Sequence, residues 1–151
     1  MIKLSETYEK AKSFKRKYPL TVAWRIKQHC KIIDKHLNND EKVRYVFLGQ
    51  KNNGALDFTN TNVIVLTNKR LMLATKRLLF GYFFTSITPD MFNDLSIKKN
   101  IIWGRVTIDT IKEEVSLSNI SPEALPEIET NVVSYMMKQK KKFNERFDQK
   151  K

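Results

Sequence analysis

The feature that most limits the fold of this 151-residue chain is a long series of short strand patterns with no helical pattern between them. Runs rich in β-branched and aromatic residues occupy positions 43–51, 62–67, 70–76, a stretch between Gly81 and Pro89, 95–99, 101–111 and 114–118. Turn signals separate several of them, at Asn52-Asn53-Gly54, Asn68-Lys69 and Lys112-Glu113. Connections this short join antiparallel neighbours, because a parallel pair needs a long crossover. The pattern predicts about seven antiparallel strands in a sandwich or barrel.

Two of these segments carry more detailed predictions. Residues 101–111 alternate, with Gly104, Val106 and Ile108 between more polar neighbours, which is typical of a strand with one buried face. The alternating neighbours are Trp103, Arg105, Thr107 and Asp109. A glycine inside a strand predicts a bend or a close approach at Gly104. At the 68–69 turn, we expect Asn68 to adopt the left-handed angles of a two-residue hairpin.

Helical patterns flank the strands on both sides. Residues 5–17 have Ser5 as a capping residue but few apolar positions. After Pro19, we expect Thr21 to cap a second helix that ends at residues 38–40, with one apolar face made by Val22, Ile26, Ile33 and Leu37. The last helix has Pro126 in its first turn, and its apolar stripe consists of Ile128, Val132, Tyr135 or Met136, Phe143 and Phe147.

The net charge of +12 is concentrated at the two ends of the chain. Residues 1–38 hold ten Lys and Arg against three Asp and Glu, and residues 138–151 hold seven against two. Residues 39–137 hold eleven of each and are neutral overall. Long-range attraction to an anionic surface is therefore expected to come chiefly from the ends, which we expect to lie apart or to face a shared anionic partner.

The sequence also limits the compartment. The N-terminus lacks the apolar stretch of an export signal, and no apolar run is long enough to span a membrane. The single Cys30 rules out an internal disulfide framework and fits a reducing environment. These observations predict a cytoplasmic protein.

Three segments in the expected order resemble the bacterial pleckstrin-homology (PH)-like domain family. V-I-V-L-T-N-K-R-L (63–71) resembles its "lTnkRl" strand–turn–strand signature, and L-N-N-D-E-K-V (37–43) is similar to the phrase that opens its barrel. Residues 86–108 look like its proline-marked strand followed by a G-x-I-x-I strand, although Phe92 and Leu95 stand where isoleucine and valine are commoner. The resemblance implies an α+β, mostly β fold: a PH-like barrel of about seven antiparallel strands, capped by a C-terminal helix and preceded by N-terminal helices.

This comparison also suggests a division of the chain. Residues 1–37 would be an N-terminal helical extension, 38–137 the PH-like domain, and 138–151 a basic tail that continues the capping helix. Bacterial members of this fold can associate through their barrels, so the resemblance also implies that homo-oligomers can form.

No residues indicate catalysis, and we expect a non-enzymatic protein with no cofactor and no metal. The only imidazoles, His29 and His36, lie seven residues apart on the expected second helix, about 10 Å along its axis and too far apart to chelate one ion directly. The sequence has no phosphate-binding glycine loop, no H-E-x-x-H and no paired cysteine motif. Surface or half-buried positions account for both histidines.

Basic pairs inside the barrel are candidate anion ligands: Lys69 and Arg70, Lys76 and Arg77, and Lys98 and Lys99. In eukaryotic PH domains, cationic residues on hairpins at the open end bind inositol phosphates, and Lys76 and Arg77 flank a strand connection of that kind. The alternative is that each pair is only the solvated edge of a turn.

Residues 78–84 form an unusual apolar run, L-L-F-G-Y-F-F. As a loop tip beside Lys76 and Arg77, the candidate contacts Leu78, Leu79, Phe80 and Tyr82 could enter a bilayer interface or an oligomer contact. We favour the interpretation that Tyr82 to Phe84 enter the core as the next strand, which leaves only Leu79 and Phe80 exposed.

The basic ends supply a further set of candidate anchors, Lys15, Arg16, Lys17, Lys140, Lys141 and Lys142. They can be solvated helical faces, contacts to anionic lipid or contacts to nucleic acid. Phe14, Tyr18 and Trp24 alternate with basic residues, but no nucleic-acid-binding motif accompanies them.

Together these features predict an interaction module that is recruited to, or assembles on, anionic membrane or protein surfaces. Its expected partners are an anionic lipid surface, a protein or a second copy of itself, and its expected location is the cytoplasm, at the inner face of the membrane when bound. The alternative function is a small nucleic-acid-binding protein that uses the charged terminal helices.

Overall fold

The structure is a computed structural model, and it describes residues 5–51 and 60–149. Two helices, α1 (Glu6–Lys17) and α2 (Ile26–His36), precede seven strands, and a short 3-10 turn (Pro122–Ala124) leads into α3 (Leu125–Gln149). The strands are β1 (Val43–Gln50), β2 (Thr61–Thr67), β3 (Leu71–Lys76), β4 (Tyr82–Ile87), β5 (Phe92–Lys99), β6 (Gly104–Thr110) and β7 (Glu114–Ile120). The predicted mostly β architecture with flanking helices is confirmed.

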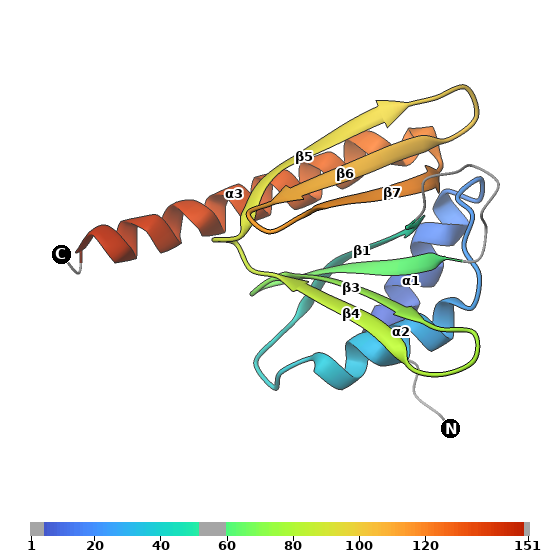
Figure 1. Cartoon of the computed structure of the whole chain (residues 1–151), viewed down its shortest axis with the longest axis horizontal. Coiled ribbons are helices and arrows are strands. Elements are labelled where there is room, and N and C mark those ends of the chain that lie inside the picture. The colour runs from blue at the N-terminus through green and yellow to red at the C-terminus, as the bar shows by residue number, and fades with distance from the viewer. Residues whose placement is uncertain (1–4, 52–59, 150–151) are drawn as a thin grey trace.

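The strands form one antiparallel sheet in the order β4-β3-β2-β1-β7-β6-β5. β1 pairs with β2 along its whole length but meets β7 only at Gln50, opposite Ser118, so the sheet folds into two halves at this point. Figure 1 shows the halves β1–β4 and β5–β7 opening away from each other. Helices α1 and α2 pack on the first half and α3 packs mainly on β5.

The antiparallel order places the β3–β4 and β5–β6 connections at one end of the molecule, together with the end of β1 and the start of β2. The segment that joins α1 to α2 lies at the same end (Figure 1). We call this the loop end. The β2–β3, β4–β5 and β6–β7 connections lie at the other end, toward which the C-terminal part of α3 extends beyond the sheet.

Both faces of β2 are covered, which explains its burial at every position. One face lies in the interior of the barrel, and α2 covers the other. Phe14 of α1 and Ile32 and Ile33 of α2 belong to the same apolar core as the strands. The N-terminal helices are therefore packed elements of the fold, despite the few apolar positions in α1.

The helix starts differ in how well the sequence predicted them. Ser5 caps α1 as expected, because its Oγ accepts a hydrogen bond from the Tyr8 amide at 3.1 Å. The expectation that Thr21 caps the second helix was wrong, since α2 begins only at Ile26, and Val22 lies outside it. The Thr21 hydroxyl instead accepts a hydrogen bond from the amide of Ser121, after β7.

The 68–69 turn also forms by a different mechanism from the one expected. Asn68 does not have a positive φ, because the only non-glycine residues with one in the described chain are Arg25 and Asn119. Its side chain bridges to the segment before β1 instead, with Oδ1 accepting from the Lys42 amide at 2.8 Å and Nδ2 donating to the Asp40 carbonyl at 3.2 Å. The Asn52-Asn53-Gly54 turn lies outside the described residues.

Details of the last elements refine the prediction. β5 starts earlier than expected, at Phe92, and β6 starts later, at Gly104. A Cβ on Gly104 would lie 2.6 Å from Cδ1 of Leu125, so the expected close approach is a side chain of α3 pressed onto the strand. In α3 the buried stripe is Ile128, Val132 and Met136, while Tyr135 is only half-buried and Phe143 is 49% exposed beyond the sheet.

Candidate functional site

Large apolar side chains are exposed together on the β3–β4 hairpin at the loop end. Leu78, Leu79 and Phe80 are 70%, 83% and 83% exposed, and Phe83 at the start of β4 is 61% exposed. Gly81 has a φ of +74°, which lets the chain reverse, and the Arg77 amide donates to its carbonyl at 3.1 Å. The hairpin therefore presents an apolar tip to solvent.

This arrangement differs in part from the favoured interpretation of residues 82–84. They do begin a strand, but they do not fill the core, because β4 is an edge strand. Tyr82 is 42% exposed, and Phe84 is half-buried with its ring stacked on that of His36 at 3.8 Å between centroids. The exposed apolar surface is thus larger than Leu79 and Phe80 alone.

Cations lie beside this tip and on the neighbouring hairpin at the same end of the molecule. Arg77 lies over the Phe83 ring, 5.3 Å from its centroid, and Lys76 ends β3 beside it. Lys98 and Lys99 are exposed at the end of β5, at the same end of the molecule. Residues 76–81 and 98–105 contain no Asp or Glu. Two of the three predicted cation pairs are therefore brought to the loop end.

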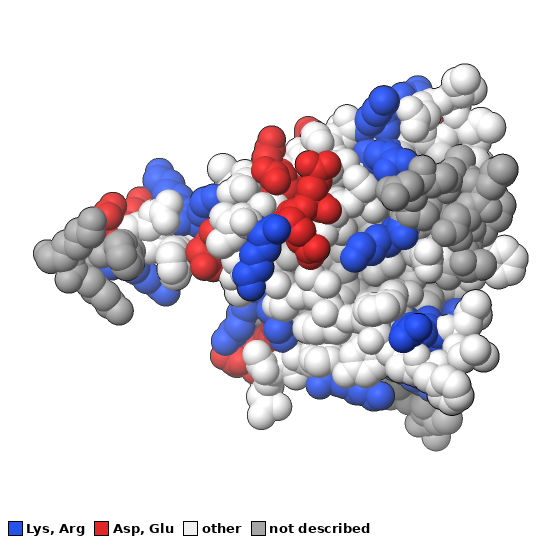
Figure 2. Space-filling model, in the orientation of Figure 1, with Lys and Arg blue, Asp and Glu red and all other residues white. Residues whose placement is uncertain are grey.

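Acidic residues gather at the other end of the second half of the sheet. Asp94 faces Asp109, and Asp109 faces Glu114, across neighbouring strands near the β6–β7 turn. Figure 2 shows red side chains grouped over this region, with blue side chains beside them and along α3, and other blue side chains among white ones toward the loop end. The acidic group would repel an anionic partner, and no such group lies on the two hairpins of the loop end.

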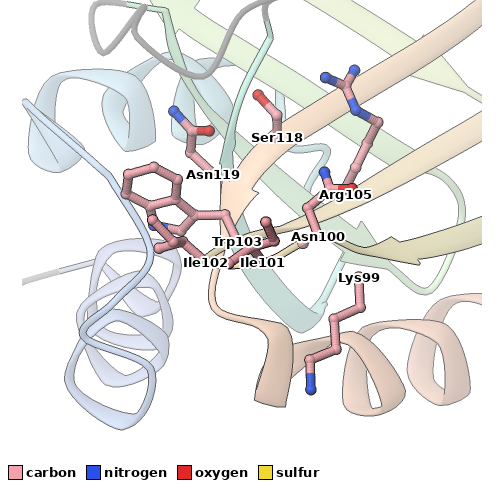
Figure 3. Close-up of a pocket in the computed structure, with 9 residues that line it drawn as sticks. Lys99, Asn100, Ile101, Ile102, Trp103, Arg105, Ser118 and Asn119 are labelled. Carbon is pink, nitrogen blue, oxygen red and sulfur yellow. The ribbon is translucent and has the colours of Figure 1, made fainter.

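A hollow of about 780 Å³ lies at the loop end between the β5–β6 connection and the end of β7. Ile101, Ile102 and Trp103 give it an apolar lining, and Lys99 and Arg105 extend from its border (Figure 3). Ile101 and Ile102 are themselves strongly exposed. This second hairpin adds apolar and cationic groups to the same end.

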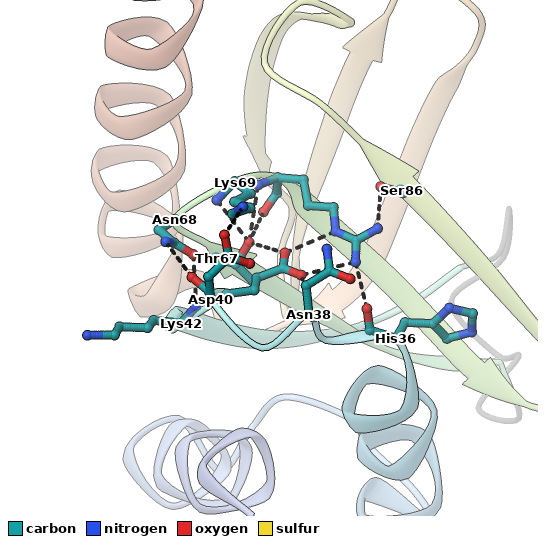
Figure 4. Close-up of polar contacts among 10 residues, drawn as sticks. His36, Asn38, Asp40, Lys42, Thr67, Asn68, Lys69 and Ser86 are labelled. Atoms are coloured by element: carbon teal, nitrogen blue, oxygen red, sulfur yellow. Dashed lines mark hydrogen bonds and ion pairs between the residues drawn. The ribbon is translucent and has the colours of Figure 1, made fainter.

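The third predicted cation pair lies elsewhere. Lys69 and Arg70 belong to the β2–β3 connection, at the end away from the other two pairs. Lys69 forms an ion pair with Asp40, and Arg70 forms one with Glu41 (Figure 4). Arg70 also donates to the His36 carbonyl at 2.7 Å and to the Ser86 hydroxyl at 3.2 Å. Both cations already have internal partners.

The Glu41 carboxylate is the centre of this network. Burial by itself raises the pKa of Glu41, but hydrogen bonds from Arg70, the Thr67 hydroxyl and the Asn38 amide outweigh it, so the pKa lies below its usual value. The carboxylate therefore stays ionised, and it joins the C-terminal end of α2 to the β2–β3 turn. This role is structural.

The predicted anchors at the chain ends are partly engaged within the protein. Lys15 donates to the carbonyls of Pro19 and Thr21, and Lys17 pairs with Glu127 at 2.6 Å. Lys140 donates to the Phe92 carbonyl at 2.6 Å. Arg16, Lys141 and Lys142 are exposed.

The imidazole of His29 and the thiol of Cys30 are both buried. Burial raises the pKa of the Cys30 thiol to about 12 and thus opposes formation of the thiolate. No three His, Cys, Asp or Glu residues in residues 5–51 and 60–149 are grouped so that they could hold a metal ion. Within the same residues, no helix has the length and apolarity needed to cross a membrane.

Sequence reasoning missed part of the loop-end surface. It did not identify Leu20, Ile101 or Ile102 as exposed apolar residues, and it considered Trp24 only as a nucleic-acid contact. The signal was present in part, since each follows a helix or strand break and lies near Lys or Arg. The strand order decides which of these breaks lie together at the loop end.

Comparisons with known proteins give a family match and similar solved structures. The model of the bacterial PH domain family matches residues 37–134. The crystal structure of a protein with a pleckstrin-homology domain from Shewanella loihica is similar over 71% of this chain and 92% of that chain, with 11% identity and a TM-score of 0.47. That of a pleckstrin-homology domain from Shewanella amazonensis is similar over 71% and 84%, with 12% identity and a TM-score of 0.48.

No curated protein matches the chain. The family model covers well over half of the sequence, and it begins just before β1 and ends within α3. The chain belongs to the bacterial PH domain family.

Proposed function

We propose that this protein is an interaction module that docks on anionic membrane surfaces through its loop end. Domains with a PH-like fold generally mediate interactions with lipids or proteins. In this proposal the tip of the β3–β4 hairpin enters the bilayer interface, and Lys76, Arg77, Lys98 and Lys99 meet the headgroups. The protein would act in the cytoplasm, at the inner face of the membrane.

One observation carries the proposal: three consecutive large apolar side chains, Leu78, Leu79 and Phe80, stand in solvent beside Arg77. Burial of a large apolar side chain contributes about 1.5–3 kcal/mol, and each Lys or Arg near an anionic surface contributes about 1 kcal/mol. The two contributions come from the same end of the molecule. Together they favour peripheral, reversible binding to anionic lipid.

The test is co-sedimentation of the full chain with neutral and anionic liposomes at low and physiological salt. Leu79→Ser and Phe80→Ser should each weaken binding to anionic vesicles. Ile111→Ser is the matched control, because Ile111 is 62% exposed but lies at the β6–β7 turn, away from the loop end. The Ile111→Ser variant should bind like the unaltered protein. If the unaltered protein fails to sediment with anionic vesicles at physiological salt, the proposal is wrong.

The same variants separate membrane docking from the other expected partners. Nucleic-acid binding would fall steeply with salt and would not change in Leu79→Ser or Phe80→Ser. Self-association through the hairpin would appear in analytical ultracentrifugation as an oligomer that Phe80→Ser dissociates. Either result without vesicle binding would replace the membrane proposal.

A further inference from the structure

The segment between α1 and α2, residues 18–25, crosses the loop end from one hairpin to another, and we call it the connector. Near its start, the indole Nε1 of Trp103, in the β5–β6 connection, donates to the Leu20 carbonyl at 2.9 Å. At its end, the Arg25 guanidinium donates to the carbonyl of Lys76, the last residue of β3, at 3.4 Å. The connector thus links the two hairpins that carry the exposed apolar groups.

Further hydrogen bonds hold the middle of the connector against the strands. The Val22 amide donates to the Asn119 carbonyl at 2.9 Å, and the Val22 carbonyl accepts from Gln50 Nε2 at 2.9 Å. The Trp24 amide donates to the Thr61 hydroxyl at 3.0 Å. These partners belong to β7, β1 and β2. The backbone of the connector therefore has a defined position on the barrel.

Backbone strain marks the same contact. Arg25 and Asn119, with φ of 55° and 58°, are the two non-glycine residues of the described chain with a positive φ. A positive φ is uncommon for residues other than glycine, although asparagine tolerates it better than arginine does. Asn119 accepts the hydrogen bond from Val22, and Arg25 reaches the end of β3. Both strained residues thus lie where the connector meets the barrel.

A buried imidazole joins the connector to the β3–β4 hairpin. His29 Nδ1 accepts from the Lys76 amide at 2.8 Å, so the proton of the neutral ring is on Nε2, which donates to the Trp24 carbonyl at 2.9 Å. His29 itself is only 2% exposed. One side chain therefore fixes both Trp24 and the base of the apolar hairpin.

The connector nevertheless presents apolar side chains to solvent. Trp24 is 61% exposed and Leu20 is 48% exposed, although the backbone around them is hydrogen-bonded. Residues 18–25 contain no acidic residue. An indole has a large apolar surface and one polar N–H, a combination that suits the boundary between hydrocarbon and headgroups.

We propose that the connector is a second lipid-contacting element, which places Trp24 and Leu20 in the interface of an anionic bilayer beside the β3–β4 hairpin. The inference rests on the proposed function and extends it to a segment outside residues 37–134, the region that matches the family. An anionic bilayer is the partner that fits the charge of this surface, because the cations Arg25, Lys76 and Arg77 lie beside the exposed apolar side chains. Two contact elements held at fixed positions would also set the orientation of the domain on the membrane.

The first test follows Trp24 fluorescence in the full-length Trp103→Phe variant, in which Trp24 is the only tryptophan. The probe is an anionic phosphatidylglycerol–phosphatidylcholine vesicle, with and without lipids brominated near the headgroup end of the acyl chains. On vesicle binding, Trp24 emission should shift to the blue and brominated lipid should quench it. As a control, a single tryptophan introduced by Ile111→Trp in the Trp24→Phe/Trp103→Phe background should show neither effect.

The second test measures affinity and does not depend on the Trp103 substitution. Trp24→Ala should weaken vesicle binding roughly tenfold, which corresponds to about 1.4 kcal/mol, while Ile111→Ser should leave it unchanged. Circular dichroism should show native secondary structure in both variants, because both side chains are exposed.

The outcomes distinguish this inference from the proposed function. If Leu79→Ser and Phe80→Ser weaken binding but Trp24→Ala does not and Trp24 remains unquenched, the hairpin docks alone and the inference is wrong. If the unaltered chain does not bind anionic vesicles, both proposals fail. Quenching of Trp24 together with loss of affinity in Trp24→Ala would support both.

Discussion

Arg70 binds Glu41 through two hydrogen bonds, from Nε to Oε2 at 3.0 Å and from Nη2 to Oε1 at 3.1 Å. The two residues come from two of the segments that resemble the family, D-E-K-V at 40–43 and T-N-K-R-L at 67–71. The Glu41 side chain is completely buried, and that of Arg70 is 18% exposed. In this chain, two of the family-like segments are therefore joined by a buried ion pair between Glu41 and Arg70.

Removal of this cation should strongly destabilise the protein. Arg70→Met leaves the Glu41 carboxylate buried without its cation, so we expect a loss of about 3–5 kcal/mol in the free energy of unfolding. Arg70→Lys should lose less, since it keeps the charge but not the two-point geometry. Urea denaturation of the three proteins measures the difference. If the Arg70→Met protein is as stable as the parent, the ion pair does not contribute to the free energy of unfolding.

His29 should make stability depend on pH. Burial lowers its pKa to about 4, the hydrogen bond to Trp24 opposes this, and the charge of Arg25 adds to it. Because the unfolded chain binds the proton more readily, the stability from neutral His29 is present above pH 6.5 and is lost as the pH falls toward 4. This loss is about 2 kcal/mol between pH 7 and pH 5.

The matched variant is His29→Gln, which does not titrate. Its free energy of unfolding, measured in urea at both pH values, should change less than that of the parent. Equal changes in the two proteins would show that other groups cause the pH dependence.

Gly104 should not tolerate a side chain while Leu125 is present. In Gly104→Ala, the new Cβ would lie within 3 Å of three side-chain carbons of Leu125, so we expect a destabilisation of roughly 1–3 kcal/mol. In the Leu125→Ala background, the same substitution should cost clearly less. A double-mutant cycle measures this coupling, and additive effects would contradict the packing described here.

The basic end of α3 should contribute little to membrane binding, although its sequence made it a candidate anchor. It extends from the sheet in the direction away from the loop end (Figure 1). Lys141→Gln/Lys142→Gln should change vesicle affinity by less than about twofold, whereas Lys98→Gln/Lys99→Gln, with the same charge change, should reduce it roughly tenfold. Vesicle co-sedimentation measures the affinity of both double variants. An equal loss of affinity in the two would show that α3 is an anchor.

The sequence predicted the strands well because their signals are local. The alternation around Val106 and Ile108 indicates a buried face regardless of what lies opposite, and both residues are fully buried. The start of α2 was mispredicted because Thr21 is a good capping residue by its type, yet its hydroxyl accepts a hydrogen bond from Ser121, one hundred residues later. No local pattern contains that contact.

The candidate site was predictable only in part for the same reason. The apolar run around Leu79 and the cations beside it are adjacent in sequence, so the hairpin could be identified as unusual. Trp24 is joined to the hairpin by the hydrogen bonds of His29 to the Trp24 carbonyl and the Lys76 amide, and His29 and Lys76 are separated by 47 positions. The exposure of Phe83 likewise depends on β4 being an edge strand, which is a property of the strand order.

Hydrogen–deuterium exchange of the full chain, with and without anionic vesicles, tests docking through the loop end, because it locates the contact along the sequence. We expect slower exchange on vesicle binding at residues 77–81 and 20–25, and no change at residues 109–114 near the acidic group. Slower exchange confined to residues 138–149, or unchanged exchange throughout the chain, would contradict docking through the loop end.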